Sequence, residues 1–206
     1  MAYGRLVGAL LALVGLGLLA ACDTDDGRAL AAPAPGATAP PLGTSAEAEP
    51  GATSDNGVVI ASSAFVNGAP IPQRYAPCPG ENVSPPLDWT GIPTNVVELV
   101  IVMSDSDAPD GGFIHWIVTG LSPTLVGIAE GSVPEGAVEA RNDTSEFGWY
   151  GPCPPVGETH QYVFTLYALT EATGIAPGTG AVDAVARITA IPGYAATLTG
   201  TYAVPA

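Results

Sequence analysis

Two carboxylates and a histidine lie close together in the segment S-D-S-D-A-P-D-G-G-F-I-H-W. Asp105 and Asp107 follow an apolar run, the chain turns at a proline and two glycines, and His115 opens the next apolar run. The only other histidine, His160, stands two positions before Tyr162. Imidazole, carboxylate and phenol groups at strand ends can bind an anion, hold a metal ion or serve as an acid–base pair. We therefore expect a polar pocket at the rim of a β-fold, although each histidine alone also fits a half-buried strand position.

Strands must bring these groups together, and the apolar runs predict where they lie. The strand-like stretches are residues 58–66, 96–103, 113–119, 160–169 and 197–204. Asn67-Gly68 has the sequence of a hairpin turn, and residues 74–89 form a long loop broken by prolines. One helix is predicted at residues 181–191, before Pro192. The pattern indicates a mainly β domain of two antiparallel sheets packed as a β-sandwich, with one or two short helices.

Alternation along a strand predicts which of the chemical groups share a face. In an extended segment every second side chain points the same way, so His160 and Tyr162 face one side of the sheet. The same rule places His115 with Phe113 and Ile117. Two imidazoles, a phenol and a carboxylate converge if the two histidine-bearing strands are neighbours.

The charge of the chain limits the class of partner. The sequence has 20 acidic residues, five arginines and no lysine, which gives a formal net charge of −15. A protein so acidic is not expected to bind nucleic acid, and its charge opposes docking on anionic lipid. Glycine and proline together account for 47 residues, which favours a loop-rich β-domain over a helical bundle.

The N-terminus has the pattern of an export signal. Residues 1–21 carry a short basic region and an apolar run too short to span a bilayer, followed by L-A-A-C. This ending resembles a bacterial lipoprotein signal, in which Cys22 receives lipid, and an ordinary signal peptide with an incidental cysteine is the alternative. Residues 22–57 are rich in Ala, Pro and Gly and predict a disordered stalk, and residues 58–206 form the domain. We expect an exported protein of the cell envelope that is held to the membrane by its lipid.

The cysteine count predicts one disulfide. Cys22 is assigned to lipid, so Cys78 and Cys153 remain as an even pair in an oxidising compartment. Both stand in loops rich in proline and glycine. A reactive thiol at Cys153, close to His160 in sequence, is the alternative.

Several short motifs resemble those of one protein family. They are N-V-S-P-P-L-D-W, D-S-D-A-P, H-W, G-P-C-P-P, H-Q-Y and the closing G-T-Y, in this order over about residues 58–204. Their types and order resemble the phosphatidylethanolamine-binding protein family, and most closely its bacterial branch, often called Raf-kinase-inhibitor-like. Ordered motifs over the whole domain are far more specific than any one of them.

The resemblance implies a small pocket that takes an anion such as phosphate, or a phospholipid headgroup. The matching ligand-binding positions are Asp105, His115, Pro155, His160 and Tyr162. It also implies no cofactor and no metal.

Other matching positions support the pocket, and some depart from the family pattern. The supporting positions are Asp107, Gly151, Cys153 and Pro154. Ser106 and Gln161 stand where the family usually has proline and arginine, and the bulky pair Trp149-Tyr150 narrows the expected entrance.

The physical expectation is weak anion binding. A carboxylate beside an imidazole raises its pKa, so Asp105 is expected to orient His115 or His160 and favour its charged form. The negative field of the domain opposes an anion. We expect the binding to improve as the pH falls or the salt concentration rises.

Three other functions are weighed against binding. His115, His160 and Asp105 have the residue types of a two-histidine, one-carboxylate metal face, but lack the short local spacing of common sites. Ser84 or Ser106 as a nucleophile would make a hydrolase, but no G-x-S-x-G motif is present. We interpret the chain as a lipid-anchored, extracytoplasmic binding protein without catalytic activity. Inhibition of a protease or another enzyme is the alternative that the resemblance leaves open.

Overall fold

The computed structural model describes residues 57–205. The predicted signal peptide, the predicted lipid attachment at Cys22 and the stalk, apart from Gly57, lie outside the described residues. Within the described range no helix has both the length and the apolar character that a membrane crossing needs.

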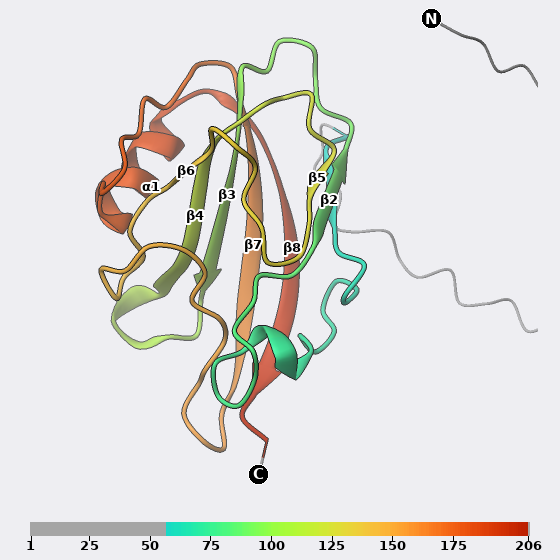
Figure 1. Ribbon diagram of the computed structural model, residues 1–206, viewed down its shortest axis with the longest axis vertical. Coiled ribbons are helices and arrows are strands. Elements are labelled where there is room, and N and C mark those ends of the chain that lie inside the picture. Colours follow the sequence, from blue (N-terminus) through green and yellow to red (C-terminus); the bar gives the residue numbers. More distant parts are fainter. Residues whose placement is uncertain (1–56, 206) are drawn as a thin grey trace, which may run out of the picture. The chain divides into compact units, whose positions relative to one another are not determined.

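Five antiparallel strands form the larger of two sheets, in the order β6-β4-β3-β7-β8 (Figure 1). Their bounds are β3 (Glu98–Asp105), β4 (Phe113–Leu121), β6 (Val138–Glu139), β7 (Thr159–Leu169) and β8 (Gly193–Ala203). The central strand β3 pairs with β4 on one side and β7 on the other. The strands predicted around both histidines are therefore second neighbours, separated only by β3.

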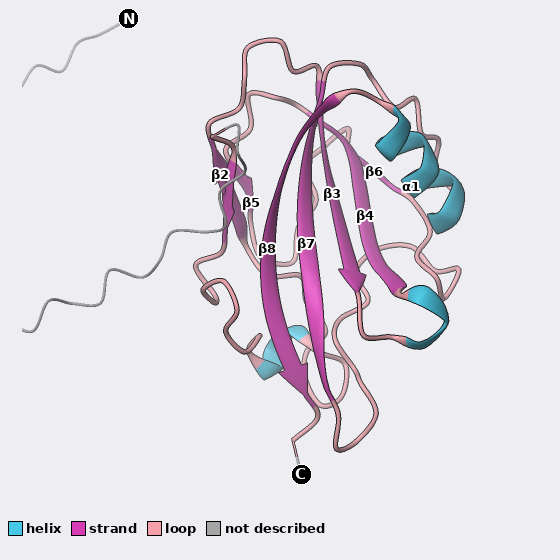
Figure 2. Ribbon diagram, turned by 180° about the vertical axis from the view of Figure 1, so that it is seen from behind, coloured by secondary structure: helices cyan, strands magenta, loops and turns pink. Residues whose placement is uncertain are grey.

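A three-stranded sheet in the order β1-β2-β5 faces the larger one. Its strands are β1 (Val59–Ala61), β2 (Leu87–Thr90) and β5 (Gly127–Ile128), and the helices are α1 (Ala181–Ala190) and the 3-10 turns Gln73–Tyr75 and Pro109–Gly111. Figure 2 shows α1 beside β4 and β6, away from the small sheet. The predicted mainly β fold with two antiparallel sheets and one helix is confirmed.

Two apolar clusters explain why β3 is almost continuously hydrophobic. Leu99, Ile101 and Met103 belong to the main core, together with Leu87 and Trp89 of the small sheet. The alternate residues of β3 face the other way, in a second cluster that contains one side of α1. A strand covered on both faces must be apolar at every position.

Several predicted elements differ in the structure. β1 is three residues long, because the chain after it leaves the sheet. Asn67-Gly68 does form a turn, in which Ala69 N–H donates to the Val66 carbonyl, but the prediction of a hairpin is wrong. This turn instead lies along β8, where the Asn67 side chain accepts from the Thr199 N–H. The predicted loop 74–89 contains most of β2, which is too short for its alternation to stand out.

A β-bulge in β4 changes the predicted face of His115. Ser104 pairs with Ile114 and Met103 pairs with Trp116, so the register passes over His115. Ile117 consequently lies in the helix-side cluster, whereas the His115 ring contacts that of Tyr162, with 5.3 Å between ring centroids. The prediction that His115 shares a face with Ile117 is therefore wrong. An extra residue in one strand re-aims its side chain, as bulges commonly do.

The predicted disulfide between Cys78 and Cys153 is confirmed. It joins the loop after the first 3-10 turn to the proline-rich loop before β7, and the two cysteines are 75 positions apart. Tyr202 of β8 supports the same region, since its hydroxyl donates to the Cys78 carbonyl at 3.2 Å.

Removal of the disulfide should cost substantial stability. For a closed loop of this length the chain-entropy account gives up to about 4.5 kcal/mol. We expect the double variant Cys78→Ala/Cys153→Ala to lose a free energy of unfolding of this order in urea denaturation. Reductant should bring the wild type to the stability of the variant and leave the variant unchanged. A wild type that contains two free thiols by mass spectrometry would contradict the assignment.

Candidate functional site

Three strand ends meet at one edge of the large sheet. In the antiparallel register, Asp105 at the end of β3 lies opposite Phe113 on one side and Tyr162 on the other. His160 is two positions earlier on β7 and pairs with Tyr202 of β8. Because β3 ends where β4 and β7 begin, chemical groups far apart in sequence come together here.

These groups line a cavity of about 220 Å³. All five residues predicted to bind a ligand line it, namely Asp105, His115, Pro155, His160 and Tyr162. Two of the four supporting positions, Cys153 and Pro154, also line it, whereas Asp107 and Gly151 do not. The sequence therefore located the groups that share the cavity, and the supporting set contains two residues that act elsewhere.

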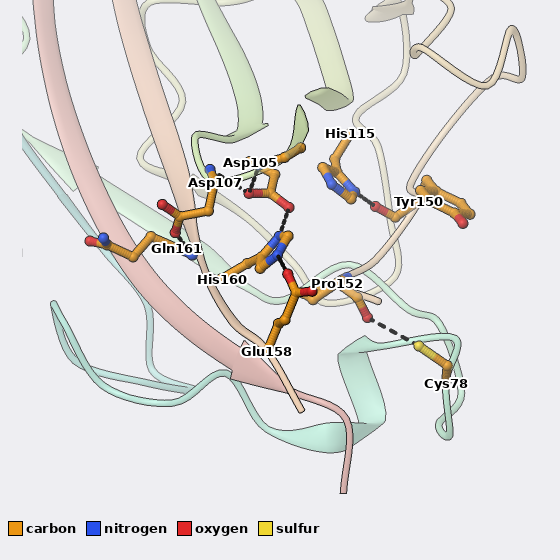
Figure 3. Close-up of polar contacts among 10 residues, drawn as sticks. Cys78, Asp105, Asp107, His115, Tyr150, Pro152, Glu158, His160 and Gln161 are labelled. Carbon is orange, nitrogen blue, oxygen red and sulfur yellow. Dashed lines mark hydrogen bonds and ion pairs between the residues drawn. The ribbon is translucent and has the colours of Figure 1, made fainter. Parts of the chain in front are cut away.

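Asp105 and His160 form a buried pair at the floor of the cavity (Figure 3). Oδ2 of Asp105 lies 2.7 Å from Nδ1 of His160, and both side chains are almost fully buried. Oδ1 accepts from the backbone N–H groups of Asp107 at 2.9 Å and Ala108 at 3.1 Å. The carboxylate is thus held in place by the turn that follows β3. Of the two histidines offered by the sequence, it is His160 that Asp105 orients.

Glu158 contacts the other nitrogen of the same imidazole. Its Oε2 lies 3.1 Å from Nε2 of His160, and its side chain is 59% exposed. Figure 3 shows Asp105 and Glu158 approaching the ring from opposite sides. The hydrogen bond to Asp105 is the largest cause that raises the pKa of His160 above 6.5, burial opposes it, and the bond to Glu158 adds to the rise.

His115 has the opposite electrostatic environment. Burial is the largest effect on its ring and lowers its pKa below 6.5, despite a hydrogen bond to the backbone. Nδ1 lies 2.7 Å from the carbonyl oxygen of Tyr150. Because a carbonyl only accepts, Nδ1 carries the proton. In the neutral ring Nε2 is then an acceptor.

Tyr162 contributes a buried hydroxyl that makes no hydrogen bond of good geometry within the protein. The residue is fully buried, and its hydroxyl is the one buried side-chain polar atom in residues 57–205 that makes no hydrogen bond. Burial, followed by the negative charge of Asp105 and the approach of its carboxylate to the hydroxyl, raises the pKa of this phenol, and the nearby backbone of Cys153 opposes the rise. The group therefore stays protonated at neutral pH and can donate to a ligand.

The proline-rich rim is fastened to the segment at residues 75–82. Gly151 N–H donates to Oδ1 of Asn82 at 2.9 Å, and the Trp149 indole donates to the Tyr75 carbonyl at 3.0 Å. A Cβ on Gly151 would lie 2.1 Å from that same carbonyl oxygen, so only glycine fits. Gly151 thus supports the rim from behind.

Asp107 supports the floor of the cavity from outside it. Its Oδ2 accepts from the Gln161 N–H at 2.7 Å, which ties the D-S-D-A-P turn to β7. The Gln161 side chain is exposed, so it points away from buried His160, as alternation predicts.

The described residues of the site include no set of metal ligands. Within residues 57–205 no group of three or more His, Cys, Asp or Glu residues is arranged to hold a metal ion. Nucleophiles are equally scarce at the cavity, since the Thr144 hydroxyl donates to Asn142 and Cys153 is in the disulfide.

Sequence reasoning did not assign three residues of the site. Phe113 lines the cavity and packs edge-on against His115, with 4.7 Å between ring centroids. Tyr150, expected only to narrow the entrance, stacks on His115 at 5.5 Å. Glu158 was missed altogether, although it stands two positions before His160 and alternation places it on the same face.

Comparison with known proteins yields consistent matches. Residues 61–203 match the sequence model of the phosphatidylethanolamine-binding protein family. The chain is 40% identical over 163 residues to a Mycobacterium tuberculosis protein named "Putative lipoprotein LppC", covering 79% of this chain and 80% of the relative. It is 39% identical over 129 residues to a UPF0098 protein of Methanothermobacter thermautotrophicus, covering 60% of this chain and 84% of the relative.

Two solved structures resemble the domain. A phosphatidylethanolamine-binding protein homologue from Chlamydia trachomatis superposes with a TM-score of 0.66 at 36% identity, covering 71% of this chain and 97% of that one. YbcL of E. coli, described as a member of the same family, superposes with a TM-score of 0.68 at 26% identity, covering 71% of this chain and 98% of that one.

The two histidines should titrate on opposite sides of 6.5, with His160 above and His115 below. Asp105→Asn removes the largest cause of the rise and should lower the pKa of His160 more than that of His115. A raised pKa means that His160 stabilises the fold fully below 6.5 and that this contribution is lost as the pH rises through the folded-state value.

The pH dependence of the imidazole C–H resonances in NMR measures both pKa values. Asp88→Asn, which removes an equal charge from an exposed position of β2, serves as the matched control and should leave both values unchanged. Equal pKa values for the two histidines in the wild type would contradict the assignment.

Proposed function

The chain belongs to the phosphatidylethanolamine-binding protein family, and from this premise we propose that it is a lipid-anchored binding protein of the cell envelope. Its ligand is a phosphate-type anion, either free or as the headgroup of a phospholipid, held in the cavity between β3, β4 and β7. The pocket acts by binding and carries out no reaction.

The hydroxyl of Tyr162, which lines the cavity without a hydrogen bond of good geometry, is the observation that carries this proposal. A buried hydroxyl without a hydrogen bond costs free energy, and such groups in native proteins call for an explanation. Here the hydroxyl lines the cavity with His115 and His160. A ligand oxygen in the cavity would complete its hydrogen bonding.

The chemistry of the walls supports a compact, polar ligand. His160 is a cation when it bonds both carboxylates, and its positive charge stands in the cavity wall beside the hydrogen-bonding groups of Tyr162 and His115. Phe113 and Tyr150 cover His115 with aromatic rings and exclude water from one side. No serine and no free thiol lines the cavity, which supports binding without a covalent step.

The proposed location rests on the N-terminal sequence and on a relative. Residues 1–22 have the pattern of a lipoprotein signal, and one relative carries the name of a lipoprotein. With lipid on Cys22, two or more acyl chains would hold the chain at a membrane despite its negative charge.

Cys22→Ser tests the anchor. We expect the variant to move from the detergent phase to the aqueous phase in Triton X-114 partitioning, because it has no thiol that can be acylated. Cys78→Ala/Cys153→Ala keeps Cys22 and should remain in the detergent phase. Partitioning of Cys22→Ser with the wild type would contradict lipid attachment.

Tyr162→Phe separates a ligand-binding role from a structural one. Because the hydroxyl makes no hydrogen bond of good geometry within the protein, its removal should leave the stability unchanged or raise it by up to about 1 kcal/mol. Affinity for inorganic phosphate should fall about threefold to tenfold, since a donor to the ligand is lost. Calorimetry of phosphate binding and urea denaturation measure the two effects.

Tyr75→Phe is the matched control, since the Tyr75 hydroxyl donates to Glu130 at 2.8 Å outside the cavity. It should lose stability and keep its affinity. Vesicles of phosphatidylethanolamine that compete with phosphate would identify a headgroup ligand, whereas phosphate binding without competition indicates the free anion. Absence of binding to either by the wild type at pH 5.5 to 7 would refute the proposed function.

A further inference from the structure

Glu158 occupies a hydrogen-bonding position that an anionic ligand would need. Its Oε2 lies 3.1 Å from Nε2 of His160, while Nδ1 of the same ring is bonded to Asp105. Ionised carboxylates only accept hydrogen bonds, so both ring N–H groups are in use. An anion that enters the cavity therefore meets a histidine whose donors are already taken.

The other side chains of the cavity leave few donors for a ligand. His115 gives its Nδ1–H to the Tyr150 carbonyl, and burial lowers its pKa and favours the neutral ring, in which Nε2 is an acceptor. Tyr162 has a hydroxyl that makes no hydrogen bond of good geometry within the protein, so it can donate to a ligand. No arginine or lysine lines the cavity. With Glu158 in place, the side chains offer one free O–H donor and one free imidazole acceptor.

We propose that Glu158 determines which anions the pocket admits, because its carboxylate competes with the ligand for Nε2 of His160. This inference rests on the proposed function and deepens it. An anion that carries a proton, such as phosphate or a phosphate monoester, donates to Nε2 of His115 and accepts from Tyr162. An anion with acceptors only, such as sulfate or the phosphodiester of a phospholipid headgroup, must first displace Glu158.

The exposure of Glu158 makes it a competitor that can be displaced. Its side chain is 59% exposed, and an ion pair with one exposed partner is weak. Asp105 is 4% exposed and bonded through both oxygens, so it stays on His160 when a ligand arrives. The groups that act on His160 are Asp105 from β3 and Glu158 from the preceding loop. His115 from β4 and His160 act on each other, and Asp143 acts on His115.

The selectivity of the pocket between two similar anions tests the inference. Phosphate carries at least one proton near neutral pH, whereas sulfate carries none and has the same tetrahedral shape. At pH 6 the wild type should bind phosphate about tenfold or more tightly than sulfate, because sulfate cannot satisfy the acceptor. Glu158→Gln and Glu158→Ala should bind sulfate about tenfold more tightly than the wild type does. Their affinity for phosphate should change less.

A matched control separates the local contact from the overall charge. Glu171→Gln removes the same charge from an exposed position beyond the far end of β7. That position is about 40 Å from Glu158 along an extended strand and well beyond the screening length of physiological salt. The affinities of Glu171→Gln for both anions should equal those of the wild type. Without ligand, Glu158→Gln should lower the pKa of His160, measured by NMR, and Glu171→Gln should not.

The outcomes distinguish this inference from the proposed function. Phosphate binding by the wild type, with no gain for sulfate in either Glu158 variant, would overturn the role of Glu158 and leave the proposed function intact. An equal gain in Glu171→Gln would also overturn it, by assigning the effect to net charge. Absence of phosphate binding in the wild type and in both Glu158 variants would overturn both.

Discussion

The buried contact between Asp105 and His160 is the interaction on which the site depends. At 2.7 Å, with both side chains almost fully buried, the pair exists only because β3 and β7 are hydrogen-bonded in one register. A shift of one residue would turn His160 to the other face of the sheet. Burial of an ion pair is costly unless the remaining polar atoms are satisfied. Asp105 meets this condition by accepting two backbone N–H groups at Oδ1. The turn after β3 thus has a structural reason to begin with aspartate.

The rim of the cavity is rigid for reasons independent of that pair. The loop before β7 is joined to the segment at residues 75–82 by the disulfide, by the Asn82 side chain and by the close approach of Gly151 to a backbone carbonyl. Prolines fix its backbone and remove N–H donors that a ligand could otherwise use. Binding groups must therefore come from side chains on the strands. The rim restricts the shape of the cavity and the strands set its chemistry.

Residue types and alternation predicted much of this site, whereas register decided the rest. His160 and Tyr162 were assigned one face because β7 is a regular strand, and the motifs identified Asp105 and Pro155. The bulge at His115 depends on how β4 pairs with β3, which no pattern within β4 records. The strands β2, β5 and β6 have four, two and two residues, too few for alternation to be recognised. Glu158 could have been predicted from the sequence, since it lies two positions from a histidine in an extended segment.

The charges around His160 explain why such a pocket should select among anions without holding any of them strongly. Each carboxylate that favours the imidazolium also adds a negative charge close to the ligand, so Asp105, His160 and Glu158 together carry about −1 when the ring is protonated. The chain as a whole adds a formal charge of −15. Long-range attraction therefore contributes nothing favourable to an anion. Affinity must come from directed hydrogen bonds at short range, where the proton on each donor and acceptor matters more than the net charge. On our proposal, a ligand is recognised by the positions of its protons, and the buried hydroxyl of Tyr162 donates to the ligand when that pattern fits.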